Sequence, residues 1–569
     1  MQIGLGITVP KMGILGGDAG VGLGVGFFPG NLFLTGAQGA WYDPSDFSTL
    51  YQTSTGTTPV TAVEQPVGLM LDRSRGLVLG SELVTNGDFA SGTTGWTDIS
   101  GAWAVTGGAL VGTSVGASAY GPFANSTAVT AGRSYQATYT ITITSGGLAA
   151  RVGNTQSETY TASGTYTRFF VADTTGVTAF QVRASGSGFT GSIDNISVRE
   201  LPGNHAVQAT SASRPVLRAR YNLLTYSEQF NDGAWTKLNT TVTANAGVAP
   251  DGTTTADKLV ENSATDFHTV RPTTSVGTVG ATEILSVYAK AAERSWFALQ
   301  LGSSRTAYFN LSAGTIGTTS ASTTATITAL ANGWYRCSIA GERVATQGNQ
   351  IILASGDNVP SYTGDGTSGI LIWGEQLLTA ADQTSTGGAY QRIAAATDYD
   401  VSNPVWRPYL AFDGVDDFFN LASAISITTD MTVVRGFGRS AAGIQSAGLG
   451  TSGAEAPAEM AWNTSNDIVI GRLGTPAATV TSANTTTGYY VSTNRRDATN
   501  EIGRLSGTQI LTRASITVAG TLTDLGRRQT GTVYNSGPVY GLIVLDRALT
   551  GSELTATEQW MAGKTGVTL

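Results

Sequence analysis

The sequence predicts an all-β protein of tandem β-sandwich domains, with a glycine-rich N-terminal arm and one short C-terminal helix. Charged residues make up only 13% of the chain, against roughly 25% in ordinary globular proteins, while hydrophobic residues reach 41%. Long Thr/Ser/Gly-rich runs alternate apolar and polar side chains, as half-buried strands do. At 569 residues the chain exceeds what one core normally serves, so several domains are expected.

A short opening pattern recurs along the chain. Residues 83–89 read LVTNGDF and are followed by Gly95-Trp96-Thr97; residues 223–230 read LLTYSEQF and are followed by Trp235-Thr236. Because Trp96 and Trp235 occupy matching places, we expect them to share a packing role. The repeat predicts two related sandwiches.

The first sandwich is expected over about 80–201. In residues 135–144, Tyr, Ala and Ile alternate with Gln and Thr, which predicts a half-buried strand. The glycines of Ser145-Gly146-Gly147 predict a turn after it. The second sandwich is expected over 221–378, where Leu285, Val287 and Ala289 alternate with polar residues.

The third sandwich is expected over 405–569. Thr550-x-x-Glu553 has the pattern of a capping box and predicts a helix, with Leu554, Thr557, Trp560 and Met561 on one face packed on the sandwich edge. The other segments are expected to be an attachment arm (1–40), a connector (41–79) and two linkers (202–220 and 379–404).

Composition excludes several function classes. A net charge of −8 and a pI near 5.0 argue against a nucleic-acid partner. The first basic residue, Lys11, follows the N-terminal apolar residues, so no signal peptide is predicted, and no run is long enough to span a bilayer. The single cysteine, Cys337, allows no internal disulfide.

Little in the sequence points to catalysis. The chain has only two histidines, His205 in a linker and His268, and no P-loop, CxxC pair or HExxH. The acidic residues that come nearest to a catalytic pair are Asp413, Asp416 and Asp417, which a strand-entry turn or surface solvation explains better. We therefore expect no enzyme activity and no organic cofactor.

With catalysis not expected, the function that remains is binding. We expect the ligand to be a glycan whose sugar rings stack on aromatic side chains. Trp103, Trp296 and Trp462 are the glycan-binding candidates, since they lie outside the opening motifs and the helix; core packing is the alternative for each. A structural calcium ion is also conceivable, with Asp357 and Asp365 as candidate ligands, although turn formation accounts for both.

Several strings resemble known families. The opening NGDF…GW and the closing IDNISV (193–198) resemble the jelly-roll carbohydrate-binding modules of polysaccharide hydrolases. The string AFDGVDDF (411–418) resembles the first strand of concanavalin-like and laminin-G-like sandwiches. WYDPSD…QPVGLMLD (41–72), NLLTYSEQF and IWGEQL are similar to strings in fibre-like virion proteins of tailed bacteriophages.

The bacteriophage resemblance implies a virion structural protein, a tail fibre or spike that displays its sandwiches for adhesion to host-surface glycans. It implies that the arm docks on other virion proteins, with Phe27, Phe28, Trp41 and Tyr42 as attachment residues. It further implies a homo-oligomer, first of all a trimer, assembled into the virion in the host cytoplasm. A head-decorating fibre and a secreted bacterial carbohydrate-binding protein are the alternatives.

Overall fold

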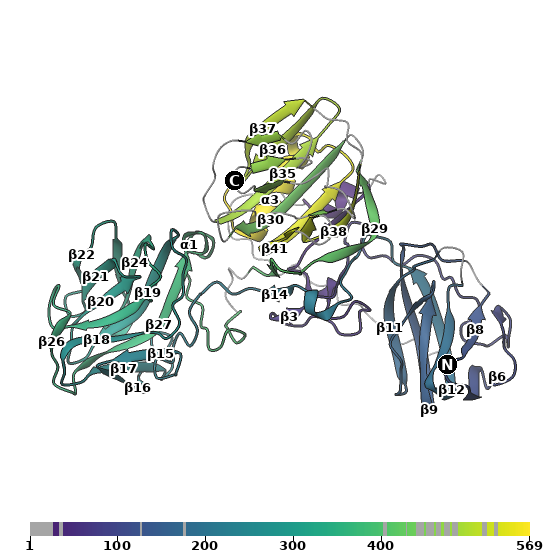
Figure 1. The fold of residues 1–569 in the computed structure, drawn as a ribbon, viewed down its shortest axis with the longest axis horizontal. Coiled ribbons are helices and arrows are strands. Elements are labelled where there is room, and N and C mark those ends of the chain that lie inside the picture. The colour runs from purple at the N-terminus through teal and green to yellow at the C-terminus, as the bar shows by residue number, and fades with distance from the viewer. Residues whose placement is uncertain are drawn as a thin grey trace, which may run out of the picture.

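The computed structural model describes residues 27–33, 38–125, 128–174, 178–401, 407–427, 430–439, 449–450, 460–462, 468–470, 478–480, 488–514, 520–528 and 533–569. Three strand-rich lobes lie side by side, with the lobe that holds the C-terminus in the middle (Figure 1). The described part contains two α-helices, α1 (Ala380–Thr386) and α3 (Gly551–Thr565), and no helix able to cross a membrane. The all-β prediction is confirmed. Short 3₁₀ turns occupy Pro29–Phe33, Phe47–Thr49, Ser211–Ser213 and Ala331–Gly333.

The first sandwich is built round two long antiparallel strands, β9 (Ser134–Val152) and β12 (Gln181–Glu200). Their pairing shifts register at bulges, which bend strands, and one eight-stranded sheet encloses the core. The alternation predicted for 135–144 is confirmed, because its apolar side chains face that core. The other strands are β5 (Trp96–Thr97), β6 (Trp103–Thr106), β7 (Ala109–Val115), β8 (Tyr120–Ala124), β10 (Thr155–Gln156) and β11 (Gly164–Val171).

The turn predicted at Ser145-Gly146-Gly147 is wrong, since β9 continues through these residues. Gly146 has φ +74°, and a Cβ atom there would lie 2.1 Å from the carbonyl oxygen of Gly188 on β12. Glycine is therefore required where the two strands approach closely, at a bulge rather than at a chain reversal.

The second sandwich has two sheets on either side of one core. Leu285, Val287 and Ala289 are fully buried in that core, as predicted. The first sheet contains β15 (Trp235–Leu238), β18 (Thr265–Pro272), β25 (Gln350–Ala354), β20 (Trp296–Leu301), β21 (Arg305–Asn310), β22 (Thr315–Thr319) and β26 (Ser361–Thr363). The second contains β16 (Thr240–Gly247), β17 (Ala256–Glu261), β27 (Gly369–Thr379), β19 (Thr282–Ala291), β24 (Trp334–Glu342) and β23 (Thr324–Ala329).

The third sandwich draws its strands from three separate parts of the chain. One sheet contains β3 (Gln65–Pro66), β14 (Val216–Arg218), β28 (Tyr409–Asp413), β41 (Ser536–Leu545), β30 (Met431–Arg439), β35 (Gly488–Arg496), β36 (Asn500–Leu505), β37 (Thr508–Ala514) and β1 (Gly39–Tyr42). The other contains β2 (Leu50–Tyr51), β4 (Leu69–Met70), β13 (Ala206–Val207), β29 (Phe419–Ile427), β38 (Gly520–Leu525) and β31 (Leu449–Gly450). Two small sheets are β32 (Met460–Trp462), β33 (Ile468–Ile470) and β34 (Ala478–Val480), and β39 (Arg527–Arg528) with β40 (Val533–Tyr534).

The segments expected as a connector (41–79) and a linker (202–220) thus lie inside the third sandwich. β1 pairs with β41, β13 lies between β4 and β29, and β14 lies between β3 and β28. Leu50, Met70 and Leu217 share one core with Leu410 and Leu542. The first two sandwiches are therefore insertions in a discontinuous third domain. Alternation along the chain reveals a strand but not its distant partner, so the sequence did not show this.

A buried carboxylate joins the chain where it leaves and re-enters the third sandwich. Asp72 accepts hydrogen bonds from the backbone N–H groups of Trp41 (2.8 Å) and Asn204 (2.7 Å). The backbone N–H of Asp72 donates to Nδ1 of His205 (2.9 Å), whose Nε2 lies 3.1 Å from the carbonyl oxygen of Leu201. Burial lowers the pKa of His205, so its imidazole is neutral and structural.

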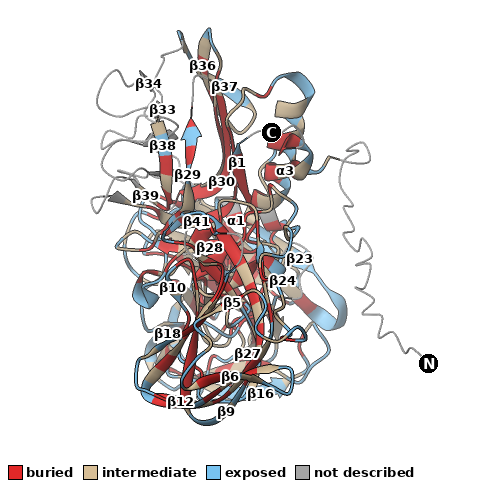
Figure 2. Ribbon diagram, turned by 90° about the vertical axis from the view of Figure 1, so that its right-hand side faces the viewer, coloured by how far each residue is buried: buried red, intermediate tan, exposed pale blue. Residues whose placement is uncertain are grey.

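The C-terminal helix is confirmed, but its predicted capping box is not formed. Thr550 makes no side-chain capping bond, and Glu553 instead accepts from Arg547 at 2.8 and 2.9 Å. The helix packs on β30, β35 and β41, across the sheet face rather than on the sandwich edge (Figure 2). Trp560 contacts Trp41 edge to face, with ring centroids 5.7 Å apart.

The short helix α1 was not predicted, although Thr379 and Asp382 form a complete capping box there. Asp382 also accepts from the hydroxyl of Tyr489 on β35 (2.6 Å), which ties the second sandwich to the third. Burial raises the pKa of the Asp382 carboxyl. A side-chain contact between Tyr51 and Phe169 joins the first sandwich to the same domain.

Candidate functional site

The first two sandwiches begin with the same local structure. Asn86 and Tyr226 have φ values of 56° and 52°, and their carbonyl oxygens accept from the indole N–H of Trp96 (3.1 Å) and Trp235 (3.0 Å). Each indole packs on a phenylalanine ring, Phe89 or Phe230, with centroids 4.9 Å apart in both copies. The predicted shared packing role of Trp96 and Trp235 is confirmed.

The loops built on this framework differ. In the first sandwich the amide of Asn86 donates to the carbonyl oxygens of Gly92 and Thr94, both at 2.9 Å, and accepts from the N–H of Ser91. Tyr226 stands at the matching position of the second sandwich, where a cleft of about 410 Å³ lies over the loop. Its lining residues are Tyr226, Glu228, Gln229, Asn231, Asp232, Ala244, Asn245, Thr255 and Asp257.

Lys237 supports the cleft loop in place of the missing amide. Its ammonium group donates to the carbonyl oxygens of Asn231 (3.0 Å), Asp232 (2.6 Å) and Trp235 (2.9 Å). Burial lowers the pKa of Lys237. Positive charge is thus held under the loop backbone rather than presented to a ligand.

The carboxylates of the cleft differ in their hydrogen-bond partners and therefore in their roles. Asp257 is buried and accepts from the backbone N–H groups of Phe230 and Asn245, both at 2.9 Å, so it holds the loop to β16. Glu228 is half-buried and accepts from the hydroxyl of Tyr390 at 3.1 Å. Burial raises the pKa of both groups. Asp232, the third carboxylate of the lining, accepts from the N–H of Ala234 within its own turn (2.8 Å). Because Glu228 is held only by a hydroxyl group, it is the acidic side chain best placed to meet a ligand.

An aromatic cluster stands behind the cleft. Trp373 donates its indole N–H to the hydroxyl of Thr255 (3.0 Å), and its ring lies 4.8 Å from that of Tyr390. The lining thus combines hydroxyl, amide and carboxylate groups on a rigid aromatic support. Such a cleft suits a polar, hydroxyl-rich molecule. The sequence signal for it was the difference between the two openings, which read NGDF at 86–89 and YSEQF at 226–230.

The predicted glycan-binding tryptophans lie apart from this cleft and from one another. Trp103 is only 7% exposed and stacks on Phe189, with centroids 5.7 Å apart, so its faces serve the core. Trp296 is half-buried beside Tyr308 and Asp357 on the second sandwich. Trp462 ends β32, and its side chain lies outside the described residues.

Both calcium candidates accept hydrogen bonds from nearby N–H and hydroxyl groups, and the N–H of Asp365 also donates to the carboxylate of Glu261 (2.9 Å). Asp357 accepts from the N–H (2.7 Å) and hydroxyl (3.0 Å) of Thr318. Asp365 accepts from Thr367 and Ser368 within its own turn, and the hydroxyl and N–H of Ser368 lower its pKa. These donor sets match turn formation, and calcium binding at either residue stays a prediction.

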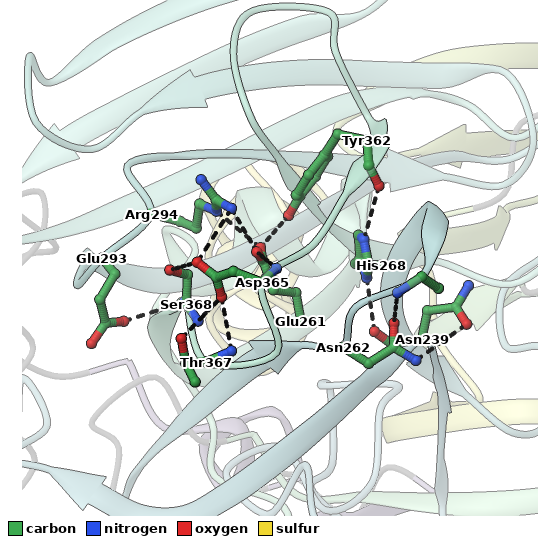
Figure 3. Close-up of polar contacts among 12 residues, drawn as sticks. Asn239, Glu261, Asn262, His268, Glu293, Arg294, Tyr362, Asp365, Thr367 and Ser368 are labelled. Atoms are coloured by element: carbon green, nitrogen blue, oxygen red, sulfur yellow. Dashed lines mark hydrogen bonds and ion pairs between the residues drawn. The ribbon is translucent and has the colours of Figure 1, made fainter.

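A polar network surrounds Asp365 (Figure 3). Arg294 donates to both oxygens of Glu261, at 2.9 and 2.5 Å, and Tyr362 donates to Glu261 at 2.6 Å. Burial alone would raise the pKa of Glu261, but these bonds outweigh it and lower the pKa. His268 is buried between the carbonyl oxygens of Asn239 (2.8 Å) and Tyr362 (3.2 Å). Because its polar groups bond one another, we interpret the network as structural.

The acidic residues at 413–417 form a turn after β28, as the strand-entry interpretation of the sequence predicts. Asp413, Asp416 and Asp417 bring carboxylate oxygens within 4.8 Å of one another. Asp413 accepts from the N–H groups of Val415 (2.8 Å) and Asp416 (3.2 Å), and Asp417 accepts from the N–H of Asp413 (2.9 Å). Burial raises the pKa of Asp417 to about 6.

The expected attachment residues belong to the third sandwich. Trp41 and Tyr42 are each 1% exposed, within β1, and cannot contact another protein without unfolding. Phe27 packs beside α3, and Phe28 lies edge to face on Trp41 with centroids 5.0 Å apart. Phe28 remains 47% exposed. Residues 1–26 of the expected arm lie outside the described residues.

No protein-family model matches the chain, and no curated protein matches it. The N-terminal CBM22-1–CBM22-2 tandem domain from Paenibacillus barcinonensis Xyn10C is 16% identical, with a TM-score of 0.21 and coverage of 53% of this chain and 98% of that one. Domains LG4-5 of the mouse laminin alpha1 chain are 12% identical, with a TM-score of 0.17 and coverage of 56% and 96%. Trypanosoma rangeli sialidase in complex with sialic acid is 8% identical, with a TM-score of 0.19 and coverage of 74% and 77%.

Similarities this weak carry no family or activity across to this chain. Its own strand pairing defines the class: a tandem β-sandwich protein in which two sandwiches are inserted into a third.

Proposed function

We propose that this chain is an adhesin that binds carbohydrate through its inserted sandwiches without cleaving it. The observation that carries the proposal is the polar cleft of the second sandwich. Its amide groups, hydroxyls and the Glu228 carboxylate offer the donors and acceptors that sugar hydroxyls need, at a fixed position on strands. An apolar ligand would find few partners there, and an anion would meet Glu228, Asp232 and Asp257.

The adhesin is proposed to be a structural protein of a tailed-bacteriophage virion, a tail fibre or spike. The strings at 41–72 and 222–230, the low charge and the hydroxyl-rich composition support this assignment. Other virion proteins would bind the N-terminal arm, and the chain would form a homo-oligomer, first of all a trimer, since repeated weak sites gain avidity when they are linked. The proposal requires no cofactor.

Binding of host-surface polysaccharide by full-length protein, measured by affinity electrophoresis, tests the adhesin. Glu228→Gln keeps the shape of the side chain but removes its charge, and we expect roughly tenfold weaker binding, the effect of one charge-assisted hydrogen bond. Asp88→Asn is the matched control, because Asp88 is exposed at the same place in the first sandwich. Equal affinity of the wild-type and Glu228→Gln proteins would refute the role of the cleft.

A second measurement separates adhesion from depolymerisation. Wild-type protein incubated with the same polysaccharide should release no new reducing ends, because cleavage by the usual mechanism needs two carboxylates across the bond. In this cleft Asp257 is committed to backbone N–H groups and Asp232 to the N–H of Ala234, which leaves Glu228. Release of reducing ends would replace the adhesin with a hydrolase.

The virion assignment is tested by deleting residues 1–26 and leaving the described part intact. The shortened chain should fold, as shown by an unchanged thermal transition, but should be missing from purified particles. Antibody labelling of intact particles would then locate the wild-type chain on the tail or the head. Normal incorporation of the shortened chain would remove the attachment arm from the proposal.

A further inference from the structure

The five arginines of the first sandwich fall into two groups. The sequence from 80 to 201 contains five arginines and no lysine. Three of the arginines form ion pairs with carboxylates: Arg133 with Glu200, Arg168 with Glu158, and Arg199 with Glu82. In the described part of the chain, Arg151 and Arg183 form no ion pair. Their charges are therefore not neutralised by a bound carboxylate.

Both of these arginines flank one exposed aromatic side chain. Tyr120 is 56% exposed, the most exposed aromatic residue in the described part of this sandwich. The guanidinium carbons of Arg151 and Arg183 lie 4.7 and 4.9 Å from the centre of its ring, within cation–π range. Two positive charges thus converge on one accessible ring in a chain whose net charge is −8.

Strand pairing places these groups on one outer face. Tyr120 on β8 lies opposite Arg183 on β12, and Arg151 on β9 lies opposite Gln181 on β12. Residues directly opposite each other on neighbouring strands lie on the same face of the sheet, and so do residues two positions apart on one strand. Val182, between Gln181 and Arg183, points into the core. The face extends to Gln156 on β10, a row roughly 14 Å wide at about 4.8 Å per strand.

Neutral groups hold the guanidinium groups in place. Arg151 donates to the side-chain oxygens of Gln181 (2.7 Å) and Asn154 (3.2 Å), and Arg183 donates to that of Gln156 (3.0 Å). These amides orient the arginines and leave their charge uncompensated. Each guanidinium has five N–H groups, so both retain donors for a ligand.

We propose that this face binds an acidic polysaccharide, with Tyr120 stacked on a sugar ring and Arg151 and Arg183 bonded to its carboxylate or sulfate groups. A row of this width across four strands suits a chain rather than a single small ion. Arginine is the side chain best adapted to planar oxyanions. The glycan nature of the ligand rests on the proposed adhesin function, whereas its negative charge rests on the two arginines alone.

The test compares matched probes on the full-length protein. Polygalacturonate is measured against its fully methylated ester, and dextran sulfate against dextran, by biolayer interferometry at two salt concentrations. We expect binding to the acidic member of at least one pair, no binding to its neutral partner, and weaker binding at high salt. The pair that responds identifies carboxylate or sulfate as the recognised anion.

Variants then locate the site. Arg151→Gln with Arg183→Gln, and separately Tyr120→Ala, should each weaken acidic binding about tenfold or more. Arg168→Gln is the matched control, because Arg168 also lies over tyrosine rings but is neutralised by Glu158. Its binding should be unchanged. Thermal unfolding confirms that each variant folds.

The outcomes separate this inference from the proposed function. Equal binding of acidic and neutral probes, or an arginine double variant that binds like wild type, would overturn the acidic site while the Glu228 test of the second sandwich stands by itself. Loss of acidic binding in the double variant, together with host-polysaccharide binding insensitive to Glu228→Gln, would support this site and reject the cleft.

Discussion

The first and second sandwiches begin with the same element but differ in the surface it supports. Both copies have a residue with positive φ (56° and 52°), an indole hydrogen bond (3.1 and 3.0 Å) and a Phe–Trp contact with ring centroids 4.9 Å apart. The amide of Asn86 bonds the carbonyl oxygens of its own loop. In the second sandwich the ammonium of Lys237 makes the corresponding bonds, and Tyr226 lines a cleft. The shared framework fixes where the loop lies, and the residues that the loop carries fix how it is held together.

The first and second sandwiches also differ where the last strand of each, β12 or β27, bonds to the segment that begins the sandwich. Ile196 donates its N–H to Gly87 and Glu375 donates its N–H to Ser227, both at 2.9 Å, and each follows a residue with positive φ, Asn195 or Gly374. Ile196 joins the core of the first sandwich. Glu375 is fully buried, neither of its carboxylate oxygens has a hydrogen-bond partner, and burial raises its pKa to about 8. Burial of the Glu375 carboxyl therefore costs the second sandwich free energy, a cost that the apolar Ile196 does not impose on the first.

The largest expected effect comes from removing the shared indole. Trp96→Ala and Trp235→Ala should each destabilise its own sandwich by about 3–5 kcal/mol, the cost of a large cavity in a packed core. Calorimetry of the full chain should show one transition moved to lower temperature in each variant. If one variant moved both transitions, the sandwiches would not be independent copies.

The second prediction concerns Glu375→Ile, which replaces the buried carboxyl by the side chain that Ile196 has at the corresponding place in the first sandwich. In the unfolded chain the carboxyl titrates near 4.5, and in the folded chain near 8, so the folded state holds the proton more tightly. Stability is full below pH 4.5 and falls as the pH rises to 8, by about 3 kcal/mol at pH 7. Urea unfolding of the second sandwich should show this loss in wild type but not in Glu375→Ile. A similar pH dependence in both proteins would contradict the assignment.

The two ways of supporting the loop predict a smaller effect. Asn86→Ala and Lys237→Met each leave loop carbonyl oxygens without their donor, and each should cost about 1–2 kcal/mol. Hydrogen exchange should report faster opening of residues 86–96 in the first variant and 226–237 in the second. A loss confined to one variant would show that amide and ammonium are not equivalent supports.

Tyr226→Asn should have the smallest effect on stability. Asparagine tolerates positive φ better than tyrosine, so the free energy of unfolding should change by only a few tenths of a kcal/mol, in the stabilising direction. If the new amide bonds the loop as Asn86 does, polysaccharide binding should fall with no loss of stability. Unchanged binding would show that Tyr226 does not shape the cleft.

Sequence reasoning found the features that depend on neighbouring residues. The alternation at 135–144, the buried face of Leu285, Val287 and Ala289, and the matched Trp96 and Trp235 follow from period two and repetition, and all are present. The C-terminal helix was predicted from another local pattern, Thr550-x-x-Glu553, although Glu553 bonds Arg547 in the structure and does not form the capping bond. Gly146 was misinterpreted, because a close approach between strands and a turn need the same residue.

The sequence by itself determined the local properties of this protein: alternation that forms strands, a composition rich in hydroxyl groups, and an opening pattern that occurs twice. Only the tertiary structure decided that residues 39–79 and 202–220 complete the third sandwich, that Trp103 is a core residue, and that Arg151 and Arg183 meet at the ring of Tyr120. The physical reason is that a strand's alternation records which face is buried, whereas its partners are chosen by hydrogen bonds to segments hundreds of residues away.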